Sequence, residues 1–264
     1  MCSIKDAKRI VVKVGTSTIA YPTGRMNIRK IECLVKVLAD IKNSGREVVL
    51  VSSGAIGVGV GKLGLSRKPT DIPSKQAAAA VGQCELMYTY DKLFSEYSHT
   101  VAQVLLTRDV IDDAPRRRNV ENTFGRLLEM GCIPIVNEND TVATDEIESG
   151  GNFGDNDTLS ALVAEVCDAE ALIVLSDIDG LYTDDPHTNQ DAKLIERVTE
   201  ITDDICRLAR GSGSAMGTGG MITKLHAAEI ALKKGITMAI INGGDPELLY
   251  DLLEGRQVGT LFMK

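Results

Sequence analysis

The sequence predicts an α/β fold in which a mainly parallel sheet is covered by helices on both faces. Strand-like apolar runs alternate with amphipathic helical patterns along nearly the whole chain, and these apolar runs are continuous. Continuous runs are typical of strands that are buried on both faces, and helices between them supply the crossovers that parallel strands need. We see no linker, internal repeat or low-complexity stretch, so we expect one domain over residues 1–264.

The individual elements follow from local patterns. The segment 27–45 is a clear helix, because apolar residues recur on one face and Gly45 provides a C-terminal stop. Ser74 is the expected N-cap of the helix that follows it, and Asp157 or Thr158 the expected N-cap of a later one. In chain order we expect strands over residues 9–15, 47–54, 101–107, 133–140, 171–177 and 237–243, and helices over 27–45, 74–97, 119–131, 157–166, 223–235 and 246–255, with 258–262 closing the chain.

Composition and charge argue against several classes of function. The 264 residues include 29 lysines and arginines and 37 acidic residues, which give a formal net charge of −8. An acidic chain without a basic block is a poor nucleic-acid binder, and the short basic run 116–118 is better explained as a solvated helix start. No segment has the pattern of a signal peptide or the length of a membrane span, so we expect a cytoplasmic protein with no membrane partner.

The potential metal ligands are dispersed. The 6 cysteines form no C-x-x-C pair, which in a chain of this size indicates reduced thiols and not a disulfide framework or a zinc site. The 3 histidines are far apart in the sequence. We therefore predict no metal site built from protein ligands alone, although Mg²⁺ held by oxygens and phosphates remains compatible with the sequence.

Polar residues are concentrated directly after the predicted strands. In open parallel sheets, ligands bind beyond the carboxyl ends of the strands, so these residues are expected to meet at one edge. Five segments contribute, and they contain Lys13 and Gly15, Ser52 to Gly54, Asn137 to Asp140, Asp155 to Asp157, and Ser176 with Asp177.

Two lysines, one in this set and one in a later helix, indicate an anionic ligand. Lys13 lies inside an apolar strand, where burial is unfavourable unless an anion meets it. By pattern alone, an edge strand with the lysine in solvent is equally compatible. Lys224 lies in the first turn of a helix that follows glycines, and both the free N–H groups and the lysine favour a phosphate there. An incidental surface lysine after a flexible loop is the alternative.

Two other features have a simple structural interpretation. The glycines from Gly54 to Gly64 resemble a P-loop, but the required spacing and the residue after Lys62 do not match. A G-x-G-x-x-G match at Gly59 lacks the strand–glycine–helix context of a dinucleotide site, and we interpret it as close helix packing. The small residues of QAAAAVGQ, from Gln76, are interpreted in the same way.

The cluster Asp155, Asn156 and Asp157 is harder to explain by structure alone. A helix cap and a solvated loop would account for it in isolation. Beside two lysines and several glycine-led helix starts, however, carboxylates can orient lysines, hold magnesium–phosphate or bind the amino group of a substrate. Phosphoryl transfer relies mostly on positioning and charge neutralisation, and it accounts for such a mixed cluster.

Seven motifs together resemble the glutamate 5-kinase family of the amino acid kinase superfamily. They are VVKVGTS, VVLVSSGAI, KQAAAAVGQ, NENDTVATDEI, GDNDTLSALVA, LSDIDGLYTDDP and GTGGMITKLHAAEIA, in order over nearly the whole chain. The resemblance implies a three-layer α/β/α sandwich with an open, mainly parallel sheet. It also implies transfer of the ATP γ-phosphate to the side-chain carboxylate of L-glutamate, as the first step of proline biosynthesis.

The resemblance also implies roles for single residues. Lys13 and Lys224 match lysines that neutralise charge on the transferring phosphate, and Asp157 matches the acid that orients them. The positions that match the glutamate-binding residues are Ser53, Asp140 and Asn156. The positions that match the ATP-binding segments are Lys13, Gly15, Ser176, Asp177, Thr218, Gly219, Gly220, Met221 and Lys224.

The family pattern extends to partners and regulation. It implies Mg²⁺ held mainly by the ATP phosphates, proline as a feedback inhibitor and a homo-oligomer, either a dimer or a tetramer. We expect no C-terminal PUA domain, which many members carry, and SGGNF from Ser149 lengthens the loop before GDND. A kinase acting on N-acetylglutamate, a non-catalytic amino-acid or nucleotide sensor on the same fold and a dinucleotide oxidoreductase are the competing interpretations.

Overall fold

The computed structural model describes residues 3–142, 156–186, 188–211 and 220–264, and its strands form one mainly parallel sheet. The order across the sheet is β3-β4-β2-β1-β5-β7-β8-β6, and β7 and β8 pair antiparallel. The strands in chain order are β1 Arg9–Val14, β2 Glu47–Ser52, β3 Val101–Leu106, β4 Ile133–Glu138, β5 Ala171–Ser176, β6 Arg197–Val198, β7 Thr237–Asn242 and β8 Thr260–Phe262.

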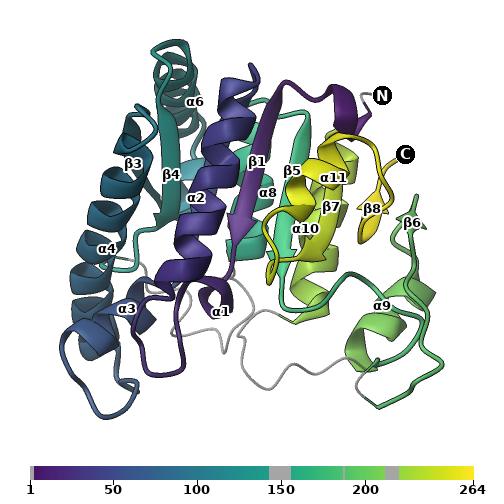
Figure 1. Ribbon diagram of the computed structural model, residues 1–264, viewed down its shortest axis with the longest axis horizontal. Helices are drawn as coiled ribbons and strands as arrows, with labels where there is room; N and C mark the ends of the chain where they lie inside the picture. The colour runs from purple at the N-terminus through teal and green to yellow at the C-terminus, as the bar shows by residue number, and fades with distance from the viewer. Residues whose placement is uncertain (1–2, 143–155, 187, 212–219) are drawn as a thin grey trace.

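Helices cover both faces of the sheet (Figure 1), which confirms the predicted fold class. The helices α2 Ile28–Asn43 and α11 Leu248–Leu253 lie in front in this view, and α8 Asn156–Val166 and α10 Met221–Lys233 lie behind. The remaining described helices are η1 Ile4–Asp6, α1 Thr16–Ile19, α3 Ala55–Lys62, α4 Ile72–Ser95, α5 Arg108–Asp112, α6 Ala114–Glu129 and α9 Asp203–Gly211.

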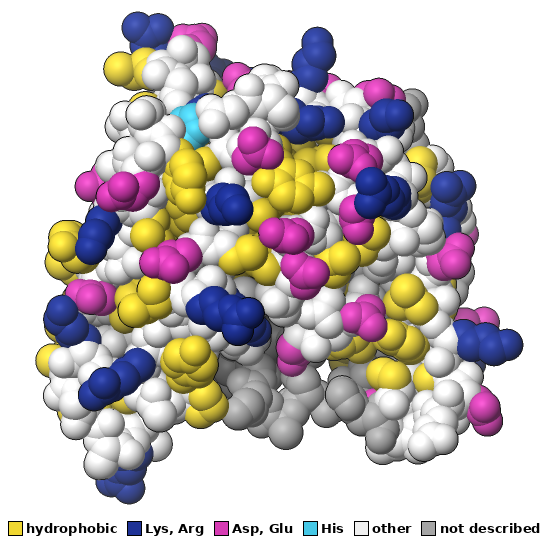
Figure 2. Space-filling view, in the orientation of Figure 1, with side chains coloured by type: hydrophobic (Ala, Val, Ile, Leu, Met, Phe, Trp, Pro, Cys, Tyr) yellow, Lys and Arg dark blue, Asp and Glu magenta, His cyan; other side chains and the backbone are white. Residues whose placement is uncertain are grey.

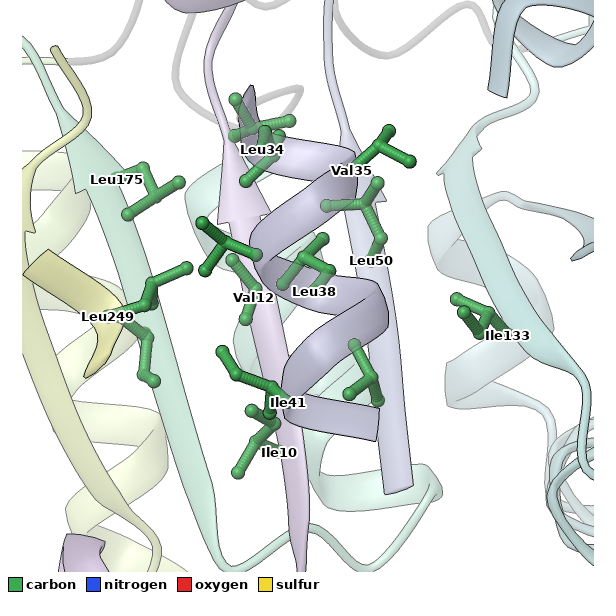
Figure 3. Packing of buried hydrophobic residues seen from close by; sticks show 14 of the residues in the cluster. Ile10, Val12, Leu34, Val35, Leu38, Ile41, Leu50, Ile133, Leu175 and Leu249 are labelled. Carbon is green, nitrogen blue, oxygen red and sulfur yellow. The ribbon is translucent and has the colours of Figure 1, made fainter. Parts of the chain in front are cut away.

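Alternate residues of each central strand enter two different cores. Along β1, Ile10 and Val12 pack on one side, whereas Val11 packs on the other. Figure 3 shows the first core, where Leu34, Leu38 and Ile41 of α2 lie against Val12 and Leu50 of the sheet. All the central strands are apolar on both faces, which explains their continuous hydrophobic runs.

Most element positions agree with the sequence, but the helix starts differ from the predicted ones by one to five residues. The helix α4 begins at Ile72, and Asp71, not Ser74, caps it by accepting a hydrogen bond of 2.9 Å from the Ser74 N–H. The helix α6 begins at Ala114, five residues before the predicted start, so the basic run 116–118 lies in its first turns. The helix α8 already includes Asn156, so Asp157 and Thr158 lie within the helix and not at its cap.

The glycines of α3 allow it to pack closely against α4, as predicted from their spacing. A Cβ atom at Gly59 would lie 1.8 Å from the Ala78 carbonyl oxygen. A Cβ atom at Gly82 would likewise lie 1.8 Å from the Ala55 carbonyl oxygen. The two helices therefore touch through their backbones, which fixes α4 relative to the turn that joins β2 to α3.

The face of the molecule in Figure 2 carries interspersed acidic and basic side chains without a continuous basic patch. Across the described part of the chain, none of the helices is both long enough and apolar enough to span a membrane.

Candidate active site

The site lies at the carboxyl edge of the central strands, where the sequence placed it. The strand β1 pairs with β2 on one side and β5 on the other, so it is central. Lys13 is therefore not on an edge strand, and only 6% of its surface is exposed. The alternative of a solvated edge lysine is excluded.

Asp157 holds both lysines in one ionic cluster. Its Oδ1 lies 2.6 Å from Lys13 Nζ, and its Oδ2 lies 3.1 Å from Lys224 Nζ. Lys13 comes from β1, Asp157 from the first turn of α8 and Lys224 from the first turn of α10. The fold thus brings together three residues that are up to 211 positions apart in the sequence.

Burial and charge act in opposite directions on Asp157. Complete burial raises the pKa of its carboxyl group, but Lys13 and Lys224 outweigh this effect and lower the pKa to about 2. The carboxylate is ionised at neutral pH. Within the described residues, one carboxylate pairs with two buried ammonium groups, an arrangement that favours an anionic ligand.

Thr223 adds a fourth group to this cluster. Its hydroxyl lies 3.0 Å from Asp157 Oδ2 and 2.7 Å from the carbonyl oxygen of Gly220, which is the N-cap residue of α10. The carboxylate is thereby tied to the start of the helix that carries Lys224. Sequence reasoning missed Thr223, although its place directly before Lys224 in a first helical turn was visible.

A chain of polar side chains lies next to Asp157. Asn156 Nδ2 donates to Ser53 Oγ at 2.8 Å and to Asn137 Oδ1 at 3.2 Å. Asn137 Nδ2 in turn donates to Gln83 Oε1 at 2.9 Å. The predicted substrate-binding residues Ser53 and Asn156 are therefore in contact, and the structure adds Asn137 and Gln83 to them.

Asp140, the third predicted substrate-binding residue, lies two positions beyond β4 and is partly buried. Burial raises the pKa of its carboxyl group to about 6, and the charge of Lys68 lowers it only in part. Among the described residues it forms no direct hydrogen bond or ion pair with the cluster around Asp157. The structure thus places it at the same edge but does not join it to the other two.

The predicted nucleotide-binding residues that the structure describes lie in or directly after β1 and β5 and at the start of α10. Ser176 ends β5 and donates to Asp177 Oδ1 at 3.2 Å. Gly220 and Met221 begin α10, and Gly15 precedes α1 with its Cα facing Lys13 Nζ, since a Cβ there would lie 3.8 Å from that atom. Thr218, Gly219 and Asp155, which the sequence also singled out, lie outside the described residues.

This geometry suits the transfer of an anionic group. The buried cluster of Lys13, Asp157 and Lys224 adjoins both a glycine-led helix start and a set of neutral amide and hydroxyl groups. The two lysines and the start of α10 favour a phosphate, because helix N-termini and ammonium groups both attract anions. The amide and hydroxyl groups of Asn156, Asn137 and Ser53 can form hydrogen bonds with a second polar ligand.

Comparison with known proteins agrees with this geometry. A model of the amino acid kinase family matches residues 8–242, which is most of the chain. The chain belongs to the amino acid kinase family.

Relatives within the amino acid kinase family are close in sequence. The chain is 59% identical to the glutamate 5-kinase of Clostridium perfringens, covering 99% of this chain and 97% of that protein. It is 53% identical to the glutamate 5-kinase of Enterococcus faecalis, covering 99% and 96%. A solved UMP kinase from Bacillus anthracis has a TM-score of 0.66 at 19% identity, covering 97% and 96%, which shows a shared fold alone.

The amino acid kinase motifs contained signals for two of the three missed residues. The sequence had placed Asn137 among the polar residues at the end of β4 without giving it a role, and Thr223 directly precedes Lys224. Gln83 gave no signal, because it lies in a helix of small residues that local pattern assigns to packing.

Proposed function

We propose that this chain is an ATP-dependent glutamate 5-kinase, which phosphorylates the side-chain carboxylate of L-glutamate to L-glutamyl 5-phosphate. The observation that carries the proposal is the buried cluster of Lys13, Asp157 and Lys224 at the carboxyl edge of the sheet. The choice of glutamate as acceptor rests on the similarity to glutamate 5-kinases over nearly the whole chain.

The reaction needs charge neutralisation more than proton transfer. The glutamate side chain is ionised near neutral pH, so it is already a nucleophile and needs no general base. One of its oxygens attacks the γ-phosphorus of ATP, and the bond from that phosphorus to the bridging oxygen breaks to release ADP. Two anions must approach, and Lys13 and Lys224 offset their repulsion.

Asp157 prepares the two lysines for this task. Its two oxygens hold Lys13 and Lys224 at fixed positions, so neither ammonium group has to be oriented when the substrates bind. Lys224 comes from the glycine-led start of α10, whose N–H groups can bind phosphate oxygens. We assign contacts with the nucleotide to Gly15, Ser176, Asp177 and residues 218–224.

Mg²⁺ supplies further positive charge to the polyphosphate when it is bound. We assign it to the phosphate oxygens, because both carboxylate oxygens of Asp157 already contact lysine or threonine donors. On the acceptor side we assign glutamate to Ser53, Asn156 and Asp140, with Asp140 facing the substrate ammonium group.

We extend the proposal to the biological setting of the reaction. The product would enter proline synthesis in the cytoplasm, proline would inhibit the enzyme, and the working form would be a homo-oligomer of one amino acid kinase domain per chain. These assignments rest on the similarity to glutamate 5-kinases and not on contacts within the chain.

A hydroxamate assay tests the activity directly. The purified chain is incubated with ATP, Mg²⁺, hydroxylamine and either L-glutamate or N-acetylglutamate, with a reaction lacking Mg²⁺ as control. Hydroxylamine traps an acyl phosphate, so we expect hydroxamate with L-glutamate and Mg²⁺ only. Product with N-acetylglutamate instead would overturn the acceptor, and no product with either acceptor while ATP still binds would favour a sensor.

A further inference from the structure

We propose that Gln83 is a positioning residue, which sets the direction of a chain of amide hydrogen bonds so that Asn156 presents its carbonyl oxygen to the substrate ammonium group. This inference rests on the proposed function, because it assigns the ligand to the site of L-glutamate. It concerns how the site distinguishes a hydrogen-bond donor from an acceptor.

The side chains of Gln83, Asn137 and Asn156 form a directed relay. Gln83 Oε1 accepts from Asn137 Nδ2 at 2.9 Å, and Asn137 Oδ1 accepts from Asn156 Nδ2 at 3.2 Å. Each amide has one accepting end and one donating end, so the orientation of one member determines the orientation of the next. Gln83 stands at the end of the relay and faces it with its accepting Oε1, and this orientation is the one that leaves Asn156 Oδ1 for a ligand.

The relay determines which atom of Asn156 remains for a ligand. Both hydrogens of its Nδ2 are used, one by Asn137 and one by Ser53 Oγ at 2.8 Å. Its Oδ1 is buried and accepts no hydrogen bond from any part of the chain that the structure describes. A buried oxygen of this kind needs a donor, and an ammonium group is a suitable one.

The backbone holds Gln83 in the position that the relay requires. It follows Gly82, whose Cα lies so close to α3 that a Cβ would come within 1.8 Å of the Ala55 carbonyl oxygen. The helix α3 starts two residues after Ser53. At the other end of the relay, Asn137 lies in β4 and only 2% of its surface is exposed. The close approach at Gly82 and the burial of Asn137 limit shifts of the backbone at both ends of the relay.

Two substitutions of Gln83 distinguish the direction of its hydrogen bond to Asn137 from its contribution to packing. Q83M keeps the approximate size of the side chain but removes the acceptor, whereas Q83E keeps an acceptor and cannot donate when ionised. The control is Q103M, because Gln103 lies exposed on β3. The kinetic constants of each variant are measured in the hydroxamate assay, and thermal unfolding reports whether the variants are folded.

We expect Q83M to raise the glutamate KM about tenfold, which corresponds to one hydrogen bond, while the ATP KM changes less than about twofold. Q83E should stay within about threefold of wild type for both substrates, and Q103M should match wild type. A merely structural role would impair Q83M and Q83E alike, or would move both KM values together.

Each of the other outcomes overturns the inference in a distinguishable way. An unchanged glutamate KM in Q83M would show that the relay does not position Asn156. If Q83M fails to fold, Q83E alone decides: a rise in its glutamate KM well above threefold, with the ATP KM unchanged, would indicate the opposite direction and overturn the inference. If wild type forms no hydroxamate from glutamate, the proposed function itself fails and this inference fails with it.

Discussion

The two ends of α8 carry the same ionic arrangement in different surroundings. Near the first turn, Asp157 contacts Lys13 and Lys224; near the last, Glu165 Oε1 contacts Arg117 Nη2 at 2.6 Å and Lys234 Nζ at 2.8 Å. The side chains of Lys13 and Lys224 are 8% and 7% exposed, whereas those of Arg117 and Lys234 are 30% and 51% exposed. Solvent screens the second cluster but not the first.

This difference shows why one cluster is a candidate active site and the other joins helices. At Glu165, burial raises the pKa of the carboxyl group, but hydrogen bonds from Lys234 and Arg117 lower it below its usual value overall. Arg117 has a second acidic partner, Glu121, at 2.9 Å. Solvent reaches both cations there, and Glu121 is a further acid beside Arg117, whereas both lysines beside Asp157 are buried, which favours a bound anion.

A cavity also lies at the opposite edge of the sheet. It has a volume of about 520 Å³ and lies beside Glu165, and residues such as Lys8, Glu170 and Lys234 line it. Three of its acids have cationic or N–H partners: Glu165, Glu47 and Glu170. What distinguishes the candidate active site from this cavity is the burial of both of its lysines.

The largest expected effect is on turnover, and it contrasts the lysines of the two clusters. We expect Lys224→Ala to fold normally but to lower kcat at least about 100-fold, because it removes a charge that stabilises the transferring phosphate. Lys234→Ala should retain kcat within about twofold. Hydroxamate formation by the two purified variants checks this, and a fully active Lys224→Ala protein would remove Lys224 from its assigned role.

The second expected effect is on stability, and it contrasts the two acids. Asp157→Asn leaves two buried ammonium groups without their carboxylate, so we expect a loss of about 3 kcal/mol in the free energy of unfolding. Glu165→Gln should lose about 1 kcal/mol or less, because its cations are solvated. Urea denaturation measures both values. Similar losses in the two variants would show that burial does not distinguish the clusters.

The smallest expected effect is a pH dependence that separates the two acids of the carboxyl edge. Asp157 stays ionised down to a pKa of about 2, whereas Asp140, with a pKa of about 6, becomes neutral as the pH falls through that value. Neutral Asp140 cannot pair with the substrate ammonium group. We therefore expect kcat/KM for glutamate to fall roughly tenfold from pH 7 to pH 5, beyond any change shared with controls.

Asp140→Asn is the control for this titration. The variant should bind glutamate more weakly at pH 7, keep its ATP KM and lose the pH-dependent part of kcat/KM. The ratio of wild type to variant cancels the titration of ATP, which is common to both. A ratio that stays constant between pH 5 and pH 7 would contradict the assignment of Asp140, as would an equal loss of affinity for both substrates.

The sequence by itself determined the fold class and the edge of the sheet where the chemistry lies. Burial on both faces leaves continuous apolar strands, and parallel strands end at the same edge, so Lys13, Ser53 and Ser176 could be placed there from pattern alone. Local capping was less predictable: Asp71 took the position expected for Ser74, because several neighbouring polar residues can satisfy the same N–H groups.

Only the tertiary structure decided how these residues act together. It placed Lys13 on a central strand, brought Asp157 of α8 into contact with both lysines, and connected Gln83 to Asn156 through Asn137. The spacing of apolar residues along the sequence indicates which face of a helix or strand is buried. It carries no information on strand order or on contacts between distant segments. Those contacts depend on the packing of the whole chain. The direction of each hydrogen bond in the site depends on it as well.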